Sequence, residues 1–402
     1  MNNGRGQDDR FFKAKKDCCG CAACMNACPK KAITMEPDDD GYLYPVVDKV
    51  LCVECELCKK VCAFQNISVN REEPLSVYAA INKNQSVLSN SASGGLFAAL
   101  ASLVFAKGGV VFGSAFNDDI EPEHIGIENP KDMKKIQGSK YVQSSINNTF
   151  IEAEQYLKQG KIVLYTGTPC QIAGLKSYLN KDYDNLITAD LICHGVPSAE
   201  FFKGYIKYLE GKLNGKIIDF KFRDKSRGWG FMEKVVYEKH GAVREKFIVP
   251  IASYYYNYFL HGDIYRESCY ECKYAGSSKQ GDFTMGDYWG IERAHPEINT
   301  TGGVSVLLVN SKRGMALIGS LAEHLILIPS TFEQARAQNE QLSKPISKSN
   351  KRENILKMWR DGGYQAVADE YYGRNKQQII LFKIKLLVPQ PVKKVIKILL
   401  GK

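Results

Sequence analysis

Two runs of cysteine with the same spacing constrain this chain more than any other feature of its sequence. Each run reads C-x2-C-x2-C-x3-C, and the members are Cys18, Cys21, Cys24 and Cys28 in the first run and Cys52, Cys55, Cys58 and Cys62 in the second. The N-terminal residues are polar and lack the apolar core of a secretory signal. We therefore expect a cytoplasmic protein, in which clustered thiols indicate metal or redox chemistry rather than disulfides.

The spacing indicates which metal group the runs hold. It is the bacterial ferredoxin pattern, in which the fourth cysteine of each run binds the other cluster. This predicts two [4Fe–4S] clusters, the first on Cys18, Cys21, Cys24 and Cys62 and the second on Cys52, Cys55, Cys58 and Cys28. Zinc also accepts C-x2-C pairs, but two complete runs of this kind favour iron–sulfur clusters. Cys19 fits neither run and is expected to be a spare thiol.

A polar segment ending at Pro74 separates the cysteine runs from a long stretch of ordinary globular composition. We expect a ferredoxin domain over 1–67, a linker over 68–76, a mixed-sheet domain over 77–330 and a helical C-terminal region over 331–402. Apolar runs predict strands over 76–82, 110–116, 161–167, 185–193 and 216–224, and a hairpin over 231–250 that turns at His240 and Gly241. Helices are predicted over 96–107, 149–160 and 171–179. Helical signals dominate after Lys312.

This alternation predicts a mixed α/β fold with a mostly parallel sheet that also includes an antiparallel part. Four more cysteines belong to the larger domain, namely Cys170, Cys193, Cys269 and Cys272. Cys170 and Cys193 each follow a predicted strand, where an open α/β sheet borders its ligand crevice. Spacing alone leaves three interpretations open: a third [4Fe–4S] cluster, a zinc site, or two core cysteines beside an idle pair.

Several ordered motifs resemble one known family. The segments "SASGG", "QGSKYVQS", "GTPCQ", "ICHGVPS", "KFRDKSRGW", "ESCYECKYA" and "DFTMGDYWG" are similar to the beta subunit of coenzyme F420 hydrogenase and dehydrogenase, and to the core of 7-hydroxymethyl chlorophyll a reductase. The resemblance covers about residues 17–309. It implies a flavin- and iron–sulfur-dependent oxidoreductase whose 77–330 domain binds FAD beside a [4Fe–4S] cluster held by Cys170, Cys193, Cys269 and Cys272.

The resemblance also implies a redox partner protein or a small donor such as F420 or NAD(P)H, with the flavin coupling a two-electron donor to one-electron clusters. The alternative is an electron-transfer subunit without flavin, or with structural zinc at the second cysteine set. His194 is a candidate proton donor, although a lone histidine is more often structural. Arg223, Arg227 and Trp229 form a basic aromatic loop, which suits either an acidic donor or plain solvation.

The candidate flavin-binding residues come from three of these motifs. They are Ser91, Ser93, Gly94 and Gly95, then Ser139, Lys140 and Tyr141, then Thr166, Gly167 and Thr168. The first group opens a predicted helix, whose N-terminus suits a pyrophosphate and equally suits an ordinary helix cap. Lys140 suits a phosphate or the N1 region of a reduced flavin, and a solvated surface lysine is the alternative.

The net charge of +10 resides mostly in the C-terminal tail. Eight basic residues and no acidic one lie between Arg374 and Lys402, which leaves +2 for the rest and argues against nucleic-acid binding by the core. Residues 391–402 predict a short basic amphipathic helix, suited to peripheral contact with an anionic membrane or to docking on protein. No window of about 18 uncharged apolar residues predicts a transmembrane span.

Overall fold

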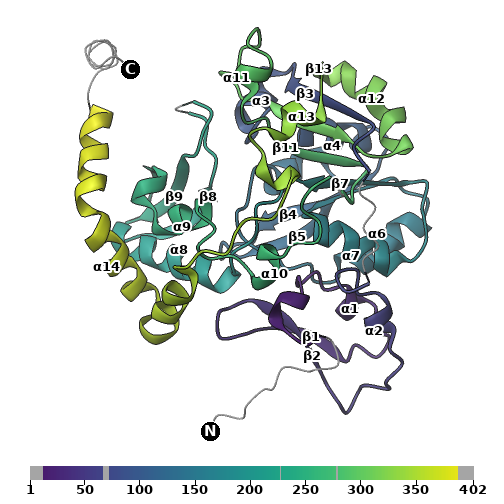
Figure 1. Cartoon of the computed structure of the whole chain (residues 1–402), viewed down its shortest axis with the longest axis horizontal. Coiled ribbons are helices and arrows are strands. Elements are labelled where there is room, and N and C mark those ends of the chain that lie inside the picture. Colours follow the sequence, from purple (N-terminus) through teal and green to yellow (C-terminus); the bar gives the residue numbers. More distant parts are fainter. Residues whose placement is uncertain (1–11, 67–71, 227, 278, 388–402) are drawn as a thin grey trace.

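The computed structural model describes residues 12–66, 72–226, 228–277 and 279–387. These residues form a small cysteine-rich module, a central eight-stranded sheet and a three-stranded sheet flanked by helices (Figure 1). The module consists of η1 (Lys15–Asp17), α1 (Ala23–Asn26), β1 (Ile33–Pro37), β2 (Leu43–Val47) and α2 (Leu57–Lys60). β1 and β2 pair antiparallel, and each one-turn helix begins inside a cysteine run.

The central sheet has the strand order β13-β3-β12-β11-β7-β6-β4-β5. Its strands are β3 (Ser76–Asn82), β4 (Val110–Phe116), β5 (Pro122–Ile127), β6 (Val163–Gly167), β7 (Leu186–Leu191), β11 (Phe283–Asp287), β12 (Ser305–Val309) and β13 (Leu325–Ser330). The four inner strands β11, β7, β6 and β4 run parallel, while the remaining four pairings are antiparallel. The expectation of a mostly parallel sheet was therefore wrong, because the strands added at both edges run antiparallel.

Helices cover both faces of the parallel strands, which explains their continuous apolar sequences. Val163 and Tyr165 of β6 pack with α6 (Thr149–Lys158) and α7 (Pro169–Leu179). Leu164, which lies between them, points to the other face, toward α4 (Leu96–Phe105) and α12 (Lys312–His324). Shorter helices connect these layers: α3 (Gln85–Asn90), η2 (Pro130–Asp132), α5 (Met133–Ile136), α10 (Glu267–Tyr270), α11 (Ile291–Ala294), α13 (Phe332–Arg336) and η4 (Glu340–Leu342).

The predicted hairpin forms a separate sheet with its own core. β8 (Lys216–Lys221), β9 (Glu233–Lys239) and β10 (Ala242–Ile248) are antiparallel. They accompany α8 (Ala199–Leu213), η3 (Pro250–Ala252), α9 (Tyr254–Leu260) and α14 (Arg352–Leu387), which is interrupted by a non-helical conformation at Gly363. This core is rich in aromatic rings, and the ring of Tyr255 contacts both Phe202 and Tyr205. α14 flanks this unit at the edge of the molecule in Figure 1.

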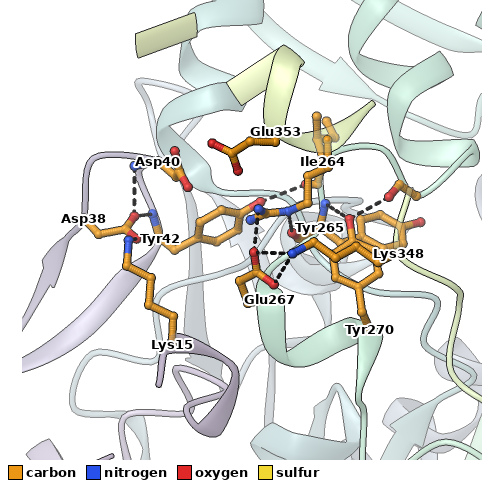
Figure 2. A network of polar contacts seen from close by, with 12 residues as sticks. Lys15, Asp38, Asp40, Tyr42, Ile264, Tyr265, Glu267, Tyr270, Lys348 and Glu353 are labelled. Carbon is orange, nitrogen blue, oxygen red and sulfur yellow. Dashed lines mark hydrogen bonds and ion pairs between the residues drawn. The ribbon is translucent and has the colours of Figure 1, made fainter. Parts of the chain in front are cut away.

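A polar network joins the cysteine-rich module to the larger domain (Figure 2). The hydroxyl of Tyr42 donates to the carbonyl of Ile264 at 2.9 Å. Glu267 pairs with Arg352 at 2.8 Å and with Lys348 at 3.0 Å, and Arg352 also donates to the carbonyl of Tyr265. The start of α14 and the segment before α10 therefore anchor the module on the larger domain.

One further difference from the sequence-based expectations lies near the C-terminus. Residues 325–330 form strand β13 at the sheet edge rather than continuing the helices. The predicted amphipathic tail over 391–402 lies outside the described residues. Among the residues that the structure describes, no helix combines the length and apolar character needed to cross a membrane.

Candidate functional site

The first predicted cluster set surrounds one cavity of about 250 Å³. Its lining includes all four predicted ligands, Cys18, Cys21, Cys24 and Cys62. Burial raises the pKa of the Cys24 thiol, and the nearby thiols of Cys21, Cys18 and Cys62 raise it further. Small residues Gly20, Ala22 and Ala23 line the same cavity and leave room beside the sulfur atoms. The donor set therefore fits a [4Fe–4S] cluster, which needs four converging thiolates.

The second predicted set surrounds a separate cavity of about 310 Å³, lined by Cys28, Cys52, Cys55 and Cys58. The backbone N–H of Ala32 donates to Cys28 Sγ at 3.3 Å, a contact that favours a thiolate. Cys55 is exposed, whereas Cys21 of the first set is buried. Cys58 lines both cavities, so the two predicted cluster sites are neighbours.

The two runs repeat the same local backbone geometry. Gly20 and Ala22 in the first run have positive φ values of 70° and 58°, and Glu54 and Glu56 at the equivalent positions of the second have 53° and 60°. Non-glycine residues adopt this left-handed conformation at a cost of roughly 1–2 kcal/mol. The repetition of this cost in both runs indicates a functional constraint on how the chain turns around the cysteines.

The four remaining predicted ligands also come together. Cys170 lies in the first turn of α7, Cys193 follows β7, and Cys269 and Cys272 lie in and just after α10. Burial raises the pKa of Cys193, and the thiols of Cys269, Cys170 and Cys272 raise it further by charge repulsion, so all four are close neighbours. Across the described residues, no group of three or more His, Cys, Asp or Glu has the arrangement of a single-ion site.

Cys19, which the sequence left as a spare thiol, lies between two of these sets. It is buried, with 6% of its surface exposed. Hydrogen-bonding contacts with Cys170 and Cys21, together with burial, raise its pKa well above the ordinary range. The side chain of Cys19 therefore contacts one thiol of the first set and one thiol of the four-cysteine group.

A cavity larger than these two, of about 370 Å³, opens at the carboxyl ends of the parallel strands, the expected place for a ligand in an α/β sheet. Its lining includes His194 and nine of the ten predicted flavin residues, namely Ser91, Ser93, Gly95, Ser139, Lys140, Tyr141, Thr166, Gly167 and Thr168. Cys170 lines it too, which brings the four-cysteine group to the cavity wall. The tenth residue, Gly94, does not line the cavity. A Cβ there would meet the carbonyl oxygen of Ala80 at 2.1 Å, so glycine permits close packing at that position.

Several hydroxyls of the predicted flavin-binding residues already donate hydrogen bonds to backbone carbonyls. Ser91 donates to the carbonyl of Val87, and Ser93 donates to that of Val304. Thr166 donates to the carbonyl of Phe112. Helix α4 begins at this end of the cavity, and its N-cap Gly95 has φ of 79° and no side-chain cap. The N–H groups of its first turn have no partner within the helix, and Gly95 and Leu96 line the cavity.

Lys140 is the cationic side chain of the cavity lining. Its ammonium donates to the carbonyls of Lys135 and Gln137, each at 3.1 Å. Burial lowers the pKa of Lys140 to about 7, and the more distant charge of Asp219 only partly offsets that effect. The lysine is thus poised to accept an anionic ligand, which would restore its charge.

Two cavity histidines are held neutral near pH 7. Burial lowers the pKa of His124 to about 4, and its ring nitrogens contact the carbonyl of Thr166 and the hydroxyl of Ser144. Burial also lowers the pKa of His194, the candidate proton donor of the sequence analysis. The charge of Asp287 raises this pKa and only partly offsets the effect of burial. His124 was missed because β5 carries no motif, and only its pairing with β4 brings it to the cavity.

Aromatic side chains form another wall of the cavity, with Trp289, Phe231 and Phe259 in its lining. Trp289 stacks on Trp229 with ring centroids 5.1 Å apart. Arg223 is buried, and its guanidinium pairs with Asp287 at 2.7 Å. Asp287 thus neutralises it, so Arg223 is not the free clamp for an acidic donor that its loop suggested. Arg227 lies outside the described residues.

Two family models match separate parts of the chain. Residues 17–66 match the 4Fe-4S dicluster domain, and residues 160–333 match the C-terminal region of the coenzyme F420 hydrogenase/dehydrogenase beta subunit. Residues 160–333 are therefore similar to this beta-subunit family.

One solved structure, of the F420-reducing [NiFe] hydrogenase complex from Methanosarcina barkeri, contains a similar chain. It is 16% identical, with a TM-score of 0.43, and the similarity covers 72% of this chain and 94% of that one. No curated protein matches the chain. The dicluster domain and the beta-subunit domain together make this an iron–sulfur electron-transfer protein of oxidoreductase type, related to F420 hydrogenase beta subunits.

Proposed function

We propose that the chain binds FAD in the large cavity and a third [4Fe–4S] cluster on Cys170, Cys193, Cys269 and Cys272. It would exchange electrons between a two-electron donor, F420 or NAD(P)H, and a redox partner protein. The supporting observation is that Cys170 belongs both to the four-cysteine group and to the cavity wall. A flavin supplies exchange of one and two electrons, and the clusters supply one-electron exchange.

The chain's own residues suit such a ligand. The N–H groups at the start of α4 favour an anionic pyrophosphate. Lys140 provides the countercharge for an anionic ligand group, and Trp289, Phe231 and Phe259 offer apolar surface for a planar ring system. His194 faces the same space, and its lowered pKa keeps its ring neutral and able to hold a proton on one nitrogen.

The three cysteine sets form a continuous series from the cavity to the surface. The four-cysteine group lines the cavity through Cys170, and Cys19 connects it to the first set. Cys58 then connects the first set to the second, where Cys55 is exposed. We propose that electrons follow this series between the cavity and a partner at the exposed end.

Metal and flavin analysis of anaerobically purified protein tests the proposal. We expect about 12 iron atoms per chain, one FAD, and bleaching of the flavin absorption by F420 or NAD(P)H in its reduced form. Cys170→Ser should remove about four iron atoms and keep the flavin, whereas the neighbouring control Cys19→Ser should keep all the iron. About eight iron atoms without flavin would instead identify an electron-transfer subunit, and zinc lost in Cys170→Ser would identify a structural zinc site.

We also propose a cytoplasmic location with peripheral membrane contact through the basic segment 391–402. Ile380, Leu381 and Ile384 of α14 are each about half-exposed, so apolar side chains lead toward that segment. Removing Lys376 onward should abolish co-sedimentation with anionic liposomes. Unchanged co-sedimentation would leave docking on protein as the role of the segment.

A further inference from the structure

Arg266 differs from the other fully buried arginines of the described chain. Three arginines are buried: Arg223 with 6% of its surface exposed, Arg352 with 1% and Arg266 with 0%. Arg223 pairs with Asp287 and Arg352 pairs with Glu267. Within the ranges that the structure describes, no carboxylate lies within ion-pair distance of Arg266. A buried charge without a counter-charge costs several kcal/mol, so an anion is expected beside it.

The groups around Arg266 identify that anion. Its Nε donates to the carbonyl of Cys18 at 2.8 Å, and its Nη2 approaches Cys18 Sγ at 3.6 Å. Its Nη1 donates to Gln143 at 3.3 Å, and the guanidinium lies 4.0 Å from the ring centre of Tyr44. Among these neighbours, Cys18 alone is a predicted metal ligand. Its thiolate is therefore the anion expected beside Arg266.

The surrounding backbone is shaped to admit this guanidinium. A Cβ at Gly20 would lie 2.7 Å from Gln143 Nε2 and 3.0 Å from Arg266 Nη1. Gln143 also donates to the carbonyl of Cys19. The first cysteine run therefore wraps one end of Arg266, and the larger domain supplies the arginine from the residue preceding α10.

From this geometry we infer that Arg266 is the built-in counter-charge of the first cysteine set and raises the reduction potential of its cluster. Four thiolates around a [4Fe–4S] core carry net negative charge, which increases by one when the cluster accepts an electron without a proton. A fixed cation beside Cys18 stabilises the reduced form more than the oxidised form, and the N–H group directed at Sγ acts in the same sense. Screening by salt is weak at a buried position.

The inference rests on the iron–sulfur part of the proposed function and is independent of the flavin. Its test is a redox titration of anaerobic full-length protein with dithionite, monitored by electron paramagnetic resonance. Arg266→Gln should move one cluster signal to lower potential by more than any other signal, because the guanidinium approaches Cys18 Sγ directly. Arg266→Lys, which keeps the charge, should shift that signal less, and both differences should persist at high salt.

Arg352→Gln is the matched control, because it also neutralises a buried arginine at the same joint. Its partner Glu267 keeps the ion pair with Lys348, and Arg352 makes no hydrogen bond or ion pair with a cysteine of the described chain. This variant should leave every cluster potential unchanged.

Equal shifts in Arg266→Lys and Arg266→Gln, or no shift in a fully loaded Arg266→Gln, would overturn the inference. If Arg266→Gln fails to hold iron at the first set, Arg266→Lys decides. Loading with a near-normal potential supports the charge role, and loss of the cluster there too refutes it. Wild-type protein without iron would refute the iron–sulfur function itself, which is a separate outcome.

Discussion

At the scale of single residues, Lys140 gives the most direct test of the large cavity. Lys140→Met should weaken FAD binding to the protein by roughly tenfold or more, because a charge-assisted contact contributes about 1.5–3 kcal/mol. Because the pKa of free Lys140 is about 7, an anionic ligand must recruit a proton above that pH. Wild-type affinity should therefore fall as the pH rises from 7 to 9, and the affinity of the variant should not.

Lys135→Met is the control for this measurement. Lys135 precedes Lys140 in the same segment, pairs with Asp132 at 2.9 Å and does not line the cavity. Its replacement should leave FAD titrations unchanged. Equal affinities for wild type and Lys140→Met across this pH range would show that Lys140 is not the countercharge.

Glu233 is a second residue whose environment predicts a measurable effect. It is fully buried, its oxygens contact Tyr205 and Ser253, and burial raises its pKa to about 8. The folded state therefore holds a proton that the unfolded state loses near pH 4.3. The proton on Glu233 makes its full contribution to the free energy of unfolding below that pH. Above it, the contribution falls by about 1.4 kcal/mol per pH unit until the pH reaches about 8.

Glu233→Gln removes this titration, so its stability relative to wild type should increase between pH 5 and pH 8. Thermal unfolding of the two anaerobic proteins across this range measures the difference. A constant difference would mean that Glu233 is ionised in the folded protein.

At the scale of helices and strands, α7 connects the cysteine-rich module to the central sheet. A Cβ at Gly174 would lie 2.9 Å from Cys21 Sγ, because α7 packs directly against α1. Gly174→Ala should destabilise the protein by about 1–3 kcal/mol and lower the iron content of the first set. Thermal midpoints and iron analysis measure both effects.

Gly211 provides the opposite case on α8. A Cβ there would meet nothing within 4 Å, so Gly211→Ala should stabilise the protein by about 0.5–1 kcal/mol and keep all its iron. If Gly174→Ala behaved like Gly211→Ala, the packing of α7 on α1 would be looser than described.

The elements that the sequence predicted well are those with strong local patterns. β6, β7, α4 and the β9–β10 hairpin combine apolar periodicity with glycine or capping residues at their ends. Four strands of the central sheet were missed, namely β5, β11, β12 and β13. The edge strands β5 and β13 are stabilised by pairing with β4 and β3 rather than by their own composition. Local sequence patterns likewise did not predict which neighbouring strands pair parallel and which pair antiparallel.

The candidate site likewise contains some residues that sequence patterns predict and others that they do not. The cysteine spacing predicts the two ferredoxin sets, since three of the four ligands of each cluster lie close together in one run. His124, Gln143 and Arg266 come from distant segments, and only the tertiary fold places them near Lys140 or Cys18. Their roles could not be predicted from any motif of the chain.

At the scale of the whole molecule, the cysteine sets differ in their access to solvent. The second set has the exposed Cys55, and Val50, Leu51 and Val53 beside it are also exposed. The first set lies against α7 and Arg266. A chelator or air should therefore remove about four iron atoms in a fast phase and the others slowly, as absorbance at cluster wavelengths would report.

Cys55→Ser should eliminate that fast phase, because it removes the ligand most accessible to solvent. Cys24→Ser, in the first set, should keep it. Loss of all the iron in a single phase would show that the sets do not differ in protection.

The arrangement of Arg266 and α7 over the first set also limits the order in which the protein can mature. These groups belong to the larger domain, and they close over Cys18 and Cys21 when the two halves of the chain dock. Iron and sulfide must therefore reach the first set while the nascent halves are still apart. The second set, which has the exposed Cys55, can be filled, or repaired after damage, in the finished molecule.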